Sequence, residues 1–359
     1  PPVIQAICLS PAGRLQHLHL ITDSPTERLV ADIHLTMAIF DYDHVRDMAT
    51  GRVKPEGIEL TVINHDVEEI FHRMMFGQEF DVSEISMGMS TSRVSQGDAP
   101  FVLLPIFPSR VFRLSSIYVR AGGPINTPAD LKGKRIGVPE WGQTAGIYTR
   151  GWMVHQAGVK LTDADWFQSG INDPGRQEAA TLDLPDGVNL TVVTDRSLTD
   201  MMFDGDLDAA FSARAPNAFL AGDPRMVRLF PDYRKAEQAY FEETGIFPIM
   251  HTIAMRRDVF EEHRWAAMNM MTAFEEAKQR SVARINNVTA SQIAIPWLNH
   301  DAPEVNKALF GDDWWPYGIE RSRTTLEAFL QYGYEQGTLH KKMRPEDLFP
   351  EEVQHFFKY

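Results

Sequence analysis

The chain has 359 residues, of which 43% are hydrophobic and 23% are charged, a composition typical of a globular protein with one or two domains. Its formal net charge of −14 argues against binding to nucleic acid or to an anionic membrane. The single cysteine, Cys8, excludes an intrachain disulfide, and no apolar run is long enough for a transmembrane helix. The N-terminus lacks the basic start and apolar core of a signal peptide, so we expect a cytoplasmic protein.

We expect residues 1–33 to form an irregular N-terminal extension, after which predicted strands and helices alternate. Helical spacing of apolar residues is found in 67–77, and Gly77 is a plausible end of that helix. We expect strands at 33–40, 58–64 and 80–87 and in the runs "FVLLPIF" and "LSSIYVRA". Alternation of this kind indicates an α/β fold with helices packed on a mostly parallel sheet.

A second unit begins near residue 118 with the same alternation. It contains an expected strand at 135–139, a helix from about Thr144, and later strands at 188–193 and 207–213. The chain returns through "GIFPIMHTIAMRRDVF" and is then helical, with a long amphipathic helix in "EEHRWAAMNMMTAFEEAKQRSVARIN" and another in "SRTTLEAFLQYGYEQG".

The tripeptide Ile-Phe-Pro occurs twice, at 106–108 and 246–248, and each copy precedes a β-rich run. A domain inserted into another needs two connections that run side by side, and these two segments fit that role. We therefore predict that domain I consists of 1–117 plus 254–359 and that domain II is the insertion 118–253. The cleft between two such domains is a preferred place for a ligand.

Two arginines in "FPSRVFR", Arg110 and Arg113, lie just before the first of these connections. Burying an unpaired guanidinium is costly, so each arginine needs a partner. Arginine suits planar carboxylates, which it binds through two parallel hydrogen bonds. The partner is therefore either a carboxylate ligand in the cleft or one of the 49 acidic residues of the chain.

The stretch "EWGQTAG" (140–146) is predicted to turn from a strand into a helix. Gln143 and Thr144 would begin this helix, whose free N–H groups and dipole favour an anion. The simpler interpretation is that Thr144 only caps the helix. Together with Trp141, both residues are candidates for substrate binding.

Other small polar or basic residues follow predicted strands, namely Ser86 in "SMGMS" and Ser212 and Arg214 in "DAAFSARAP". Open α/β sheets bind ligands beyond the carboxyl ends of their strands, so these residues are further binding candidates. His251 in "FPIMHT" is either a hydrogen-bonded core residue or, opposite the arginines, a proton donor.

Carboxylates end or interrupt two of the predicted strands. Asp41 and Asp43 flank Tyr42 in "FDYDH", where they could accept a phenolic proton or cap the next helix. Glu84 lies inside the apolar strand "VSEIS", where it could act as an acid or pair with an arginine.

Motifs for nucleotides, zinc and nucleophilic serine are absent: the chain has no P-loop, no GxGxxG after a strand, no HExxH and no Gly-x-Ser-x-Gly. We expect neither a metal nor an organic cofactor.

Several segments together resemble the 4,5-dihydroxyphthalate decarboxylase family, namely "VKPEGIEL", "EFDVSEISM", "PIFPSRVFR", "ADLKGKRIGVPEW", "LFPDYR", "GIFPIMHT" and "WPYGIE". The resemblance covers about 34–350. It implies a two-lobed fold like that of type II periplasmic binding proteins, in which each lobe has a mixed, mostly parallel sheet flanked by helices. It also implies a planar aromatic dianion as the ligand.

The activity that the resemblance implies is decarboxylation of 4,5-dihydroxyphthalate to protocatechuate and carbon dioxide, in phthalate degradation and without a cofactor. The roles expected on this basis are carboxylate binding by Arg110, Arg113 and Arg214, delivery of the ring proton by His251 or Glu84, receipt of the phenolic proton by Asp41 or Asp43, and closure of the site by Gln143 and Thr144.

The alternative is a non-enzymatic solute-binding protein that delivers a carboxylate to a transporter through the same cleft. A decarboxylase for another hydroxylated aromatic acid is a third interpretation. The expected partner is a small aromatic carboxylate, and self-association into a homo-oligomer is left open.

Overall fold

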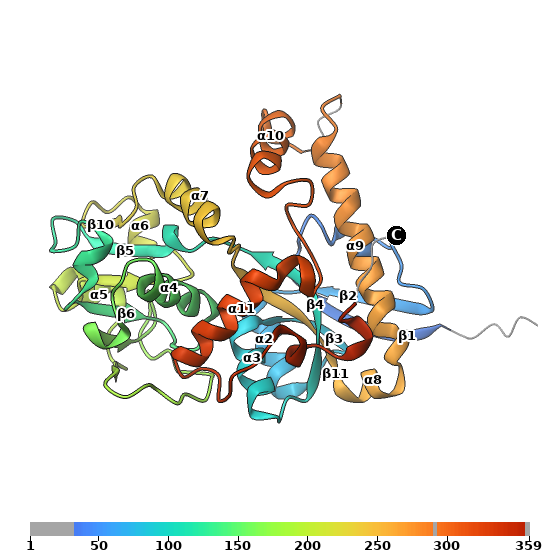
Figure 1. The fold of residues 1–359 in the computed structure, drawn as a ribbon, viewed down its shortest axis with the longest axis horizontal. Coiled ribbons are helices and arrows are strands. Elements are labelled where there is room, and N and C mark those ends of the chain that lie inside the picture. The colour runs from blue at the N-terminus through green and yellow to red at the C-terminus, as the bar shows by residue number, and fades with distance from the viewer. Residues whose placement is uncertain (1–31, 290–292, 356–359) are drawn as a thin grey trace, which may run out of the picture. The chain divides into compact units, whose positions relative to one another are not determined.

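The structure, a computed structural model, describes residues 32–289 and 293–355, and from Asp32 onward the chain forms one compact unit. The predicted irregular extension, with Cys8, lies almost entirely outside the described residues. Two β-sheets organise the compact unit (Figure 1). None of the helices in the described ranges combines the length and apolar character needed to cross a membrane.

The first sheet has five strands in the order β2-β1-β3-β11-β4. β1 pairs in parallel with β2 and β3, whereas β11 is antiparallel to both β3 and β4. The predicted strands are confirmed; apolar residues dominate the buried positions of β1 and β4, whereas the fully buried β3 contains Ser83, Glu84 and Ser86. Their bounds are β1 Ile33–Ile39, β2 Ile58–Asn64, β3 Val82–Ser86, β4 Phe101–Arg110 and β11 Ile249–Arg256.

The second sheet has six strands in the order β10-β5-β9-β6-β7-β8. β6 is parallel to β7 and β9, and β5 is antiparallel to β9 and β10, so both sheets are mixed. β7 and β10 were not predicted, because each contains only two apolar residues, whereas the equally short β8 and β9 lie within the longer expected strands 188–193 and 207–213. The bounds are β5 Ile117–Arg120, β6 Arg135–Val138, β7 Asp165–Gln168, β8 Asn189–Val192, β9 Ala209–Phe211 and β10 Met226–Arg228.

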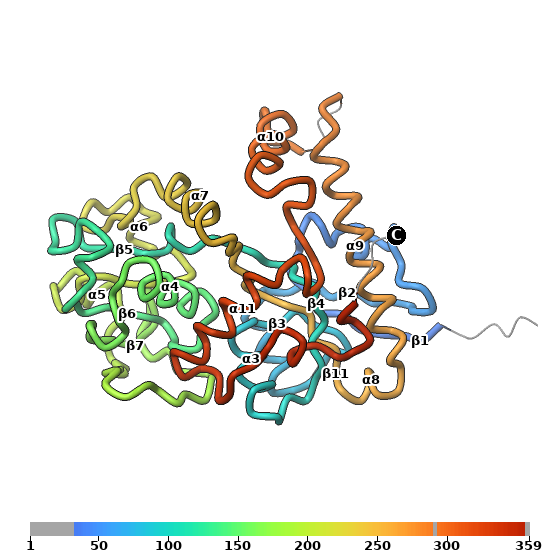
Figure 2. Tube along the Cα trace, in the orientation of Figure 1, coloured from blue at the N-terminus to red at the C-terminus, as the bar shows by residue number. Residues whose placement is uncertain are grey.

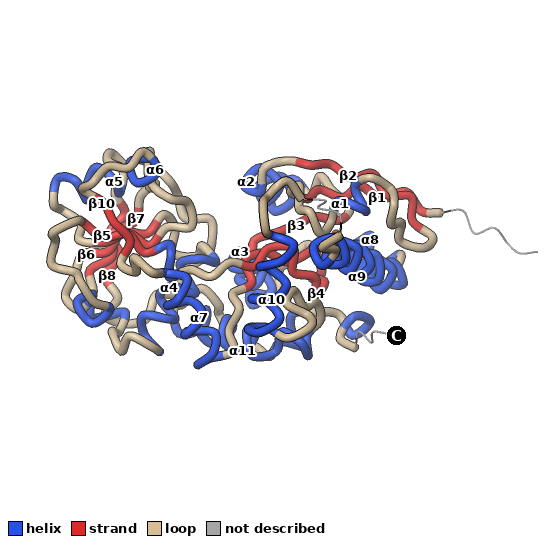
Figure 3. Tube along the Cα trace, turned by 90° about the horizontal axis from the view of Figure 1, so that it is seen from above, coloured by secondary structure: helices blue, strands red, loops and turns tan. Residues whose placement is uncertain are grey.

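Helices flank the strands of both sheets, and Figure 3 shows α5 and α6 on one side of the second sheet with α4 and α7 on the other. The long helix predicted near the C-terminal third is interrupted at His263, which separates α8 from α9. The bounds are α1 Arg46–Ala49, α2 Val67–His72, α3 Met87–Gln96, α4 Thr144–His155, α5 Leu198–Asp204, α6 Asn217–Leu220, α7 Tyr233–Thr244, α8 Arg257–Glu262, α9 Arg264–Asn286, α10 Leu298–Phe310 and α11 Ile319–Glu335.

The chain passes between the two sheets through segments that lie side by side (Figure 2). Arg110 at the end of β4 pairs with Ile249 at the start of β11, and the N–H of Val111 donates to the carbonyl of Pro248 at 3.1 Å. The two passages 110–111 and 248–249, each just after an Ile-Phe-Pro tripeptide or at its end, therefore lie next to each other.

Candidate active site

A cavity of about 230 Å³ brings together residues from both sheets. Its polar lining comes from β3, α2 and β11 on one side and from α4 and the loops after β6, β7 and β9 on the other. Apolar side chains of Phe71, Met89 and Met250 complete the wall. The charged and polar lining residues are Glu68, Ser86, Arg113, Glu140, Gln143, Thr144, Arg176, Arg214 and His251.

Two helices begin at this cavity, α3 after Ser86 and α4 at Thr144. The hydroxyl oxygens of these two residues lie 3.0 Å apart, and the N–H of Gly88 donates to Thr144 Oγ1 at 2.9 Å. A Cβ on Gly88 would meet the carbonyl oxygen of Gly142, so only glycine permits this close approach. Because the N-terminal ends of helices carry partial positive charge, this junction favours an anion in the cavity.

His251 on β11 is held by the buried carboxylate of Glu84 on β3. Its Nδ1 lies 2.5 Å from Glu84 Oε1, which also accepts the hydroxyl of Tyr42 at 2.5 Å. The N–H of Phe40 donates to the other oxygen of Glu84 at 3.0 Å. The imidazole packs edge-on against Phe71, with ring centroids 4.9 Å apart, and is 17% exposed.

The side chain of Glu84 thus contacts Tyr42, the N–H of Phe40 and His251, and these contacts fix the orientation of the imidazole. Burial, and then the charge of Glu84, raise the pKa of Tyr42, which keeps its hydroxyl a donor. Glu84 is fully buried and does not line the cavity, whereas His251 does. Within the described residues, His251 Nε2 has no hydrogen-bond partner and remains free to exchange a proton with a ligand.

Arg113 is the one arginine of the cavity wall that has no acidic residue within 4.0 Å in the described ranges. Its Nε lies 3.0 Å from the sulfur of Met250, and its Nη1 donates to the carbonyl of Ala213 at 3.3 Å. Burial lowers the pKa of Arg113 to about 10, so the guanidinium stays charged at neutral pH. A half-buried cation with such weak partners suits an anionic ligand.

Arg110 has a different environment and does not line this cavity. Its guanidinium donates to the carbonyls of Phe247 at 3.0 Å and Pro316 at 2.7 Å and to the hydroxyl of Ser322 at 2.7 Å. It also lies over the ring of Phe107, 5.1 Å from the centroid. Arg110 instead borders a separate cavity of about 340 Å³ on the side of α7 and α10.

A chain of ion pairs crosses the cavity wall between elements of the two sheets. Arg176 Nε lies 2.5 Å from Glu140, and its Nη2 lies 3.3 Å from Glu68 on α2. Arg214 also reaches Glu68, at 3.4 Å. Burial raises the pKa of Glu140, and Arg176 opposes this effect.

A second cavity of about 270 Å³ adjoins the first and shares with it Glu68, Gln143, Arg176 and Arg214. Ser212 lines this second cavity, where its hydroxyl donates to the carbonyl of Arg214 at 2.8 Å. Gln143 precedes the first residue of α4, and its buried Oε1 has no hydrogen-bond partner among the described residues. The shared residues thus separate an inner cavity from an outer one.

Besides Arg110, three more of the predicted site residues lie outside both cavities, namely Trp141, Asp41 and Asp43. Trp141 is fully buried, and its indole N–H donates to the carbonyl of Gln336 at 2.8 Å. Asp41 is exposed and lines neither cavity. Asp43 is also exposed and forms an ion pair with Arg46 at 2.8 Å. Tyr42 contacts the site only through Glu84 and His251.

Sequence reasoning missed Glu68, Glu140 and Arg176 as members of the cavity wall. Glu140 begins the turn "EWGQTAG" and could have been found there by the same strand-end logic as Gln143. Arg176 lies in the irregular segment between β7 and β8, where no periodicity marks its position. As far as the described residues extend, no cluster of three or more His, Cys, Asp or Glu could hold a metal ion.

Comparison with solved structures places the fold. The periplasmic aliphatic sulphonate binding protein of Escherichia coli is 14% identical, with a TM-score of 0.50, and the match covers 91% of this chain and 94% of that one. This similarity confirms the predicted α/β fold of the periplasmic-binding-protein type, with two mixed sheets.

Comparison with curated sequences identifies the family, although no family model matches the chain. The 4,5-dihydroxyphthalate decarboxylase of Comamonas testosteroni is 35% identical over 321 residues, which are 89% of this chain and 97% of the relative. The protein of the same name from Pseudomonas putida is 34% identical over 210 residues, 58% of this chain and 81% of the relative. The chain therefore belongs to the 4,5-dihydroxyphthalate decarboxylase family.

Proposed function

We propose that this protein is a carboxy-lyase that converts 4,5-dihydroxyphthalate into protocatechuate and carbon dioxide. Its membership of the family supports the reaction, since both curated relatives carry the name of this activity. The observation that carries the proposal at the level of the site is the presence, in one cavity, of a half-buried arginine with no ion pair within 4.0 Å among the described residues and of a histidine oriented by a buried carboxylate.

Arg113 is the proposed anchor for the carboxylate that remains on the ring. Its guanidinium is half-buried and charged, and its contacts are a sulfur and one carbonyl at 3.3 Å, which a carboxylate would replace at little cost. The N-terminal ends of α3 and α4, next to Ser86 and Thr144, supply additional positive potential. Arg214 at the junction with the outer cavity is the proposed partner of an incoming anion.

His251 is the proposed donor of the ring proton. In 4,5-dihydroxyphthalate each carboxylate is para to a hydroxyl, so loss of the hydroxyl proton pushes electron density onto the carbon that bears the carboxylate. Protonation of that carbon by His251 gives a dienone, and the ring regains aromaticity when carbon dioxide leaves. Glu84 holds the imidazole in place.

Apolar groups surround part of the cavity, which suits the departing carboxylate. Phe71, Met89 and Met250 offer no hydrogen bonds to a carboxylate beside them, so loss of its charge is favoured there. The retained carboxylate would bind Arg113, and the two carboxylates of the substrate would thereby meet different environments.

The division into domain I and the inserted domain 118–253 is part of this proposal, since a site between two domains can close around its substrate. A cytoplasmic location and a homo-oligomeric state stay predictions. Cell fractionation tests the first, and sedimentation velocity tests the second.

The experiment is incubation of the full chain with 4,5-dihydroxyphthalate, followed by chromatography for protocatechuate and a carbon dioxide assay. Equal amounts of both products are expected, without an added cofactor. Tight binding of the intact substrate without turnover would favour the solute-binding alternative. Turnover of a different hydroxylated aromatic acid, but not of 4,5-dihydroxyphthalate, would correct the substrate.

A further inference from the structure

The proposed reaction needs a group that accepts the phenolic proton, and neither Asp41 nor Asp43 lines the cavity. Two carboxylates do so among the described residues, Glu68 and Glu140. We propose that Glu140 is the general base that takes the hydroxyl proton of the substrate and returns it after carbon dioxide has left. This inference rests on the proposed function and assigns a second proton-transfer residue to the same cavity.

The backbone places Glu140 where a base is needed. It follows β6 by two residues and precedes the N-terminus of α4, so it comes from the elements of the second sheet. His251 comes from β11 of the first sheet. Acid and base thus approach a ligand from different sheets. A cavity of about 150 Å³ can hold benzene, so the roughly 230 Å³ here has room for one substituted ring in contact with both residues.

Glu140 fits the role better than Glu68. Its side chain is only 11% exposed, whereas that of Glu68 is 44% exposed and shared between two arginines. A base shielded from water exchanges its proton with the bound substrate rather than with solvent. Glu68 also lines the outer cavity, which Glu140 does not.

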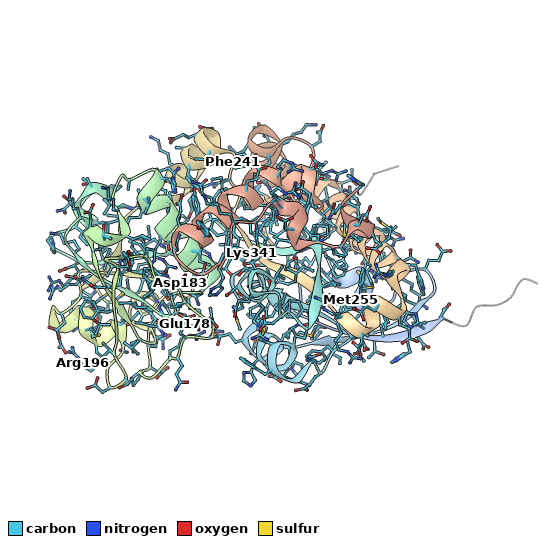
Figure 4. All side chains as sticks on the ribbon, turned by 60° about the horizontal axis from the view of Figure 1, so that its bottom comes forward. Glu178, Asp183, Arg196, Phe241, Met255 and Lys341 are labelled. Carbon is cyan, nitrogen blue, oxygen red and sulfur yellow. The ribbon has the colours of Figure 1, made fainter. Side chains whose placement is uncertain are left out.

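The surroundings of Glu140 raise its pKa above the ordinary glutamate value, which suits a general base. Burial raises its pKa, the guanidinium of Arg176 lowers it, and the charge of Glu178 raises it again. Glu178, labelled in Figure 4, lies in the segment between β7 and β8, and its carboxylate accepts the N–H of Trp141. The other charged or titratable groups of the same cavity are Glu68, Arg113, Arg214 and His251.

The proton steps balance with these two residues alone. Glu140 takes the hydroxyl proton, and charged His251 protonates the ring carbon that bears the carboxylate. The bond to that carboxylate then breaks, its electron pair returns to the ring, and carbon dioxide leaves a phenolate. Protonated Glu140 gives its proton back to the phenolate, and neutral His251 takes a proton from solvent. The net reaction consumes one proton for each carbon dioxide released.

The test compares the wild-type chain with Glu140→Gln and Glu140→Asp, with 4,5-dihydroxyphthalate as the substrate. Glu79→Gln is the matched control, because Glu79 pairs with Arg73 at 2.9 Å and lies outside both cavities. We expect kcat of Glu140→Gln to fall by roughly 10²–10⁴-fold with a much smaller change in KM. Glu140→Asp should recover part of this loss, and the control should match the wild type.

The pH profile separates a catalytic role from a structural one. Because the base must be ionised, wild-type kcat should fall on the acidic side of a pKa above the ordinary glutamate value of ~4.3, and this limb should be absent in Glu140→Gln. A Glu140→Gln chain with wild-type kcat, or with the acidic limb intact, would overturn the inference. If Glu140→Gln does not fold, a Glu140→Asp chain with an unshifted acidic limb would overturn it as well. If the wild-type chain releases no carbon dioxide, the proposed function fails, and this inference falls with it.

Discussion

Arg110 and Arg113 are only three residues apart along the chain, but their guanidinium groups lie in different environments. The guanidinium of Arg110 donates hydrogen bonds to neutral oxygen atoms of Phe247, Pro316 and Ser322 at 2.7–3.0 Å. Around Arg113, the partners are the sulfur of Met250 and one carbonyl at 3.3 Å. Burial lowers the pKa of both arginines to about 10, so both carry charge at neutral pH.

The difference shows that burial alone does not mark an arginine as a ligand-binding residue. Both terminal nitrogens of Arg110 donate to neutral acceptors and join β4 to the segments before β11 and before α11, while its Nε has no partner among the described residues. Arg113 lacks such acceptors and faces a cavity that also contains His251. We therefore expect substitution of Arg110 to change the free energy of unfolding and substitutions in the cavity beside Arg113 to change the reaction rate or KM.

The largest effect is expected on the cavity side, for His251→Asn. Asparagine keeps a hydrogen bond to Glu84 but cannot deliver a proton, so kcat should fall by roughly 10²–10⁴-fold. Steady-state kinetics with 4,5-dihydroxyphthalate measures this change. His72→Asn, at an exposed position of α2, is the matched control and should keep full activity. Wild-type turnover in His251→Asn would assign the ring proton to another group.

The second largest effect, on stability, is expected for Arg110→Met. Methionine keeps the apolar contact with Phe107, but it leaves the carbonyls of Phe247 and Pro316 without their donor. We expect the free energy of unfolding to fall by about 2–4 kcal/mol, as measured by urea denaturation. KM should stay near the wild-type value. A large rise in KM with unchanged stability would return Arg110 to the substrate site.

A smaller effect, on binding, is expected for Arg113→Ala. Removal of a charge-assisted contact to a carboxylate costs about 1.5–3 kcal/mol, which corresponds to a rise in KM of roughly 10–150-fold. The KM of Arg113→Lys should lie between those of the wild type and Arg113→Ala, because lysine keeps the positive charge but lacks the planar guanidinium. The free energy of unfolding of both variants, measured by urea denaturation, should differ little from that of the wild type. If KM is normal in Arg113→Ala, the retained carboxylate binds elsewhere.

Much of the fold follows from the sequence, because long apolar runs at regular spacing leave few alternatives. The bounds of β2 agree with the expected strand 58–64, and those of β1 differ from the expected strand by one residue. The short strands β7 and β10 could not be found, since each has only two apolar residues, whereas the equally short β8 and β9 lie within longer expected strands. The break at His263 was also missed, because the amphipathic pattern continues across it from α8 into α9.

The site was predictable to the extent that residues follow strand ends. Ser86 ends β3 and Thr144 follows β6, whereas His251 lies near the start of β11 and reaches the same cavity because β11 is antiparallel to β3 and pairs His251 with Ser86. Sequence could not separate Arg110 from Arg113, because the pairing of β4 with β11 shifts register on both sides of His251. A shift of register changes the side on which the next side chains lie, and no pattern in "FPSRVFR" reports it.

The smallest effect is expected outside both regions, for Asp43→Asn. The side chain of Asp43 is 70% exposed, and its pair with Arg46 at 2.8 Å is a surface pair of the kind that contributes about 0–1 kcal/mol. Kinetics and unfolding should therefore both match the wild type within error. Loss of turnover in Asp43→Asn, combined with normal turnover in Glu140→Gln, would place the phenolic proton at the end of β1. It would also mean that the cavity beside Arg113 rearranges around the substrate to include that strand end.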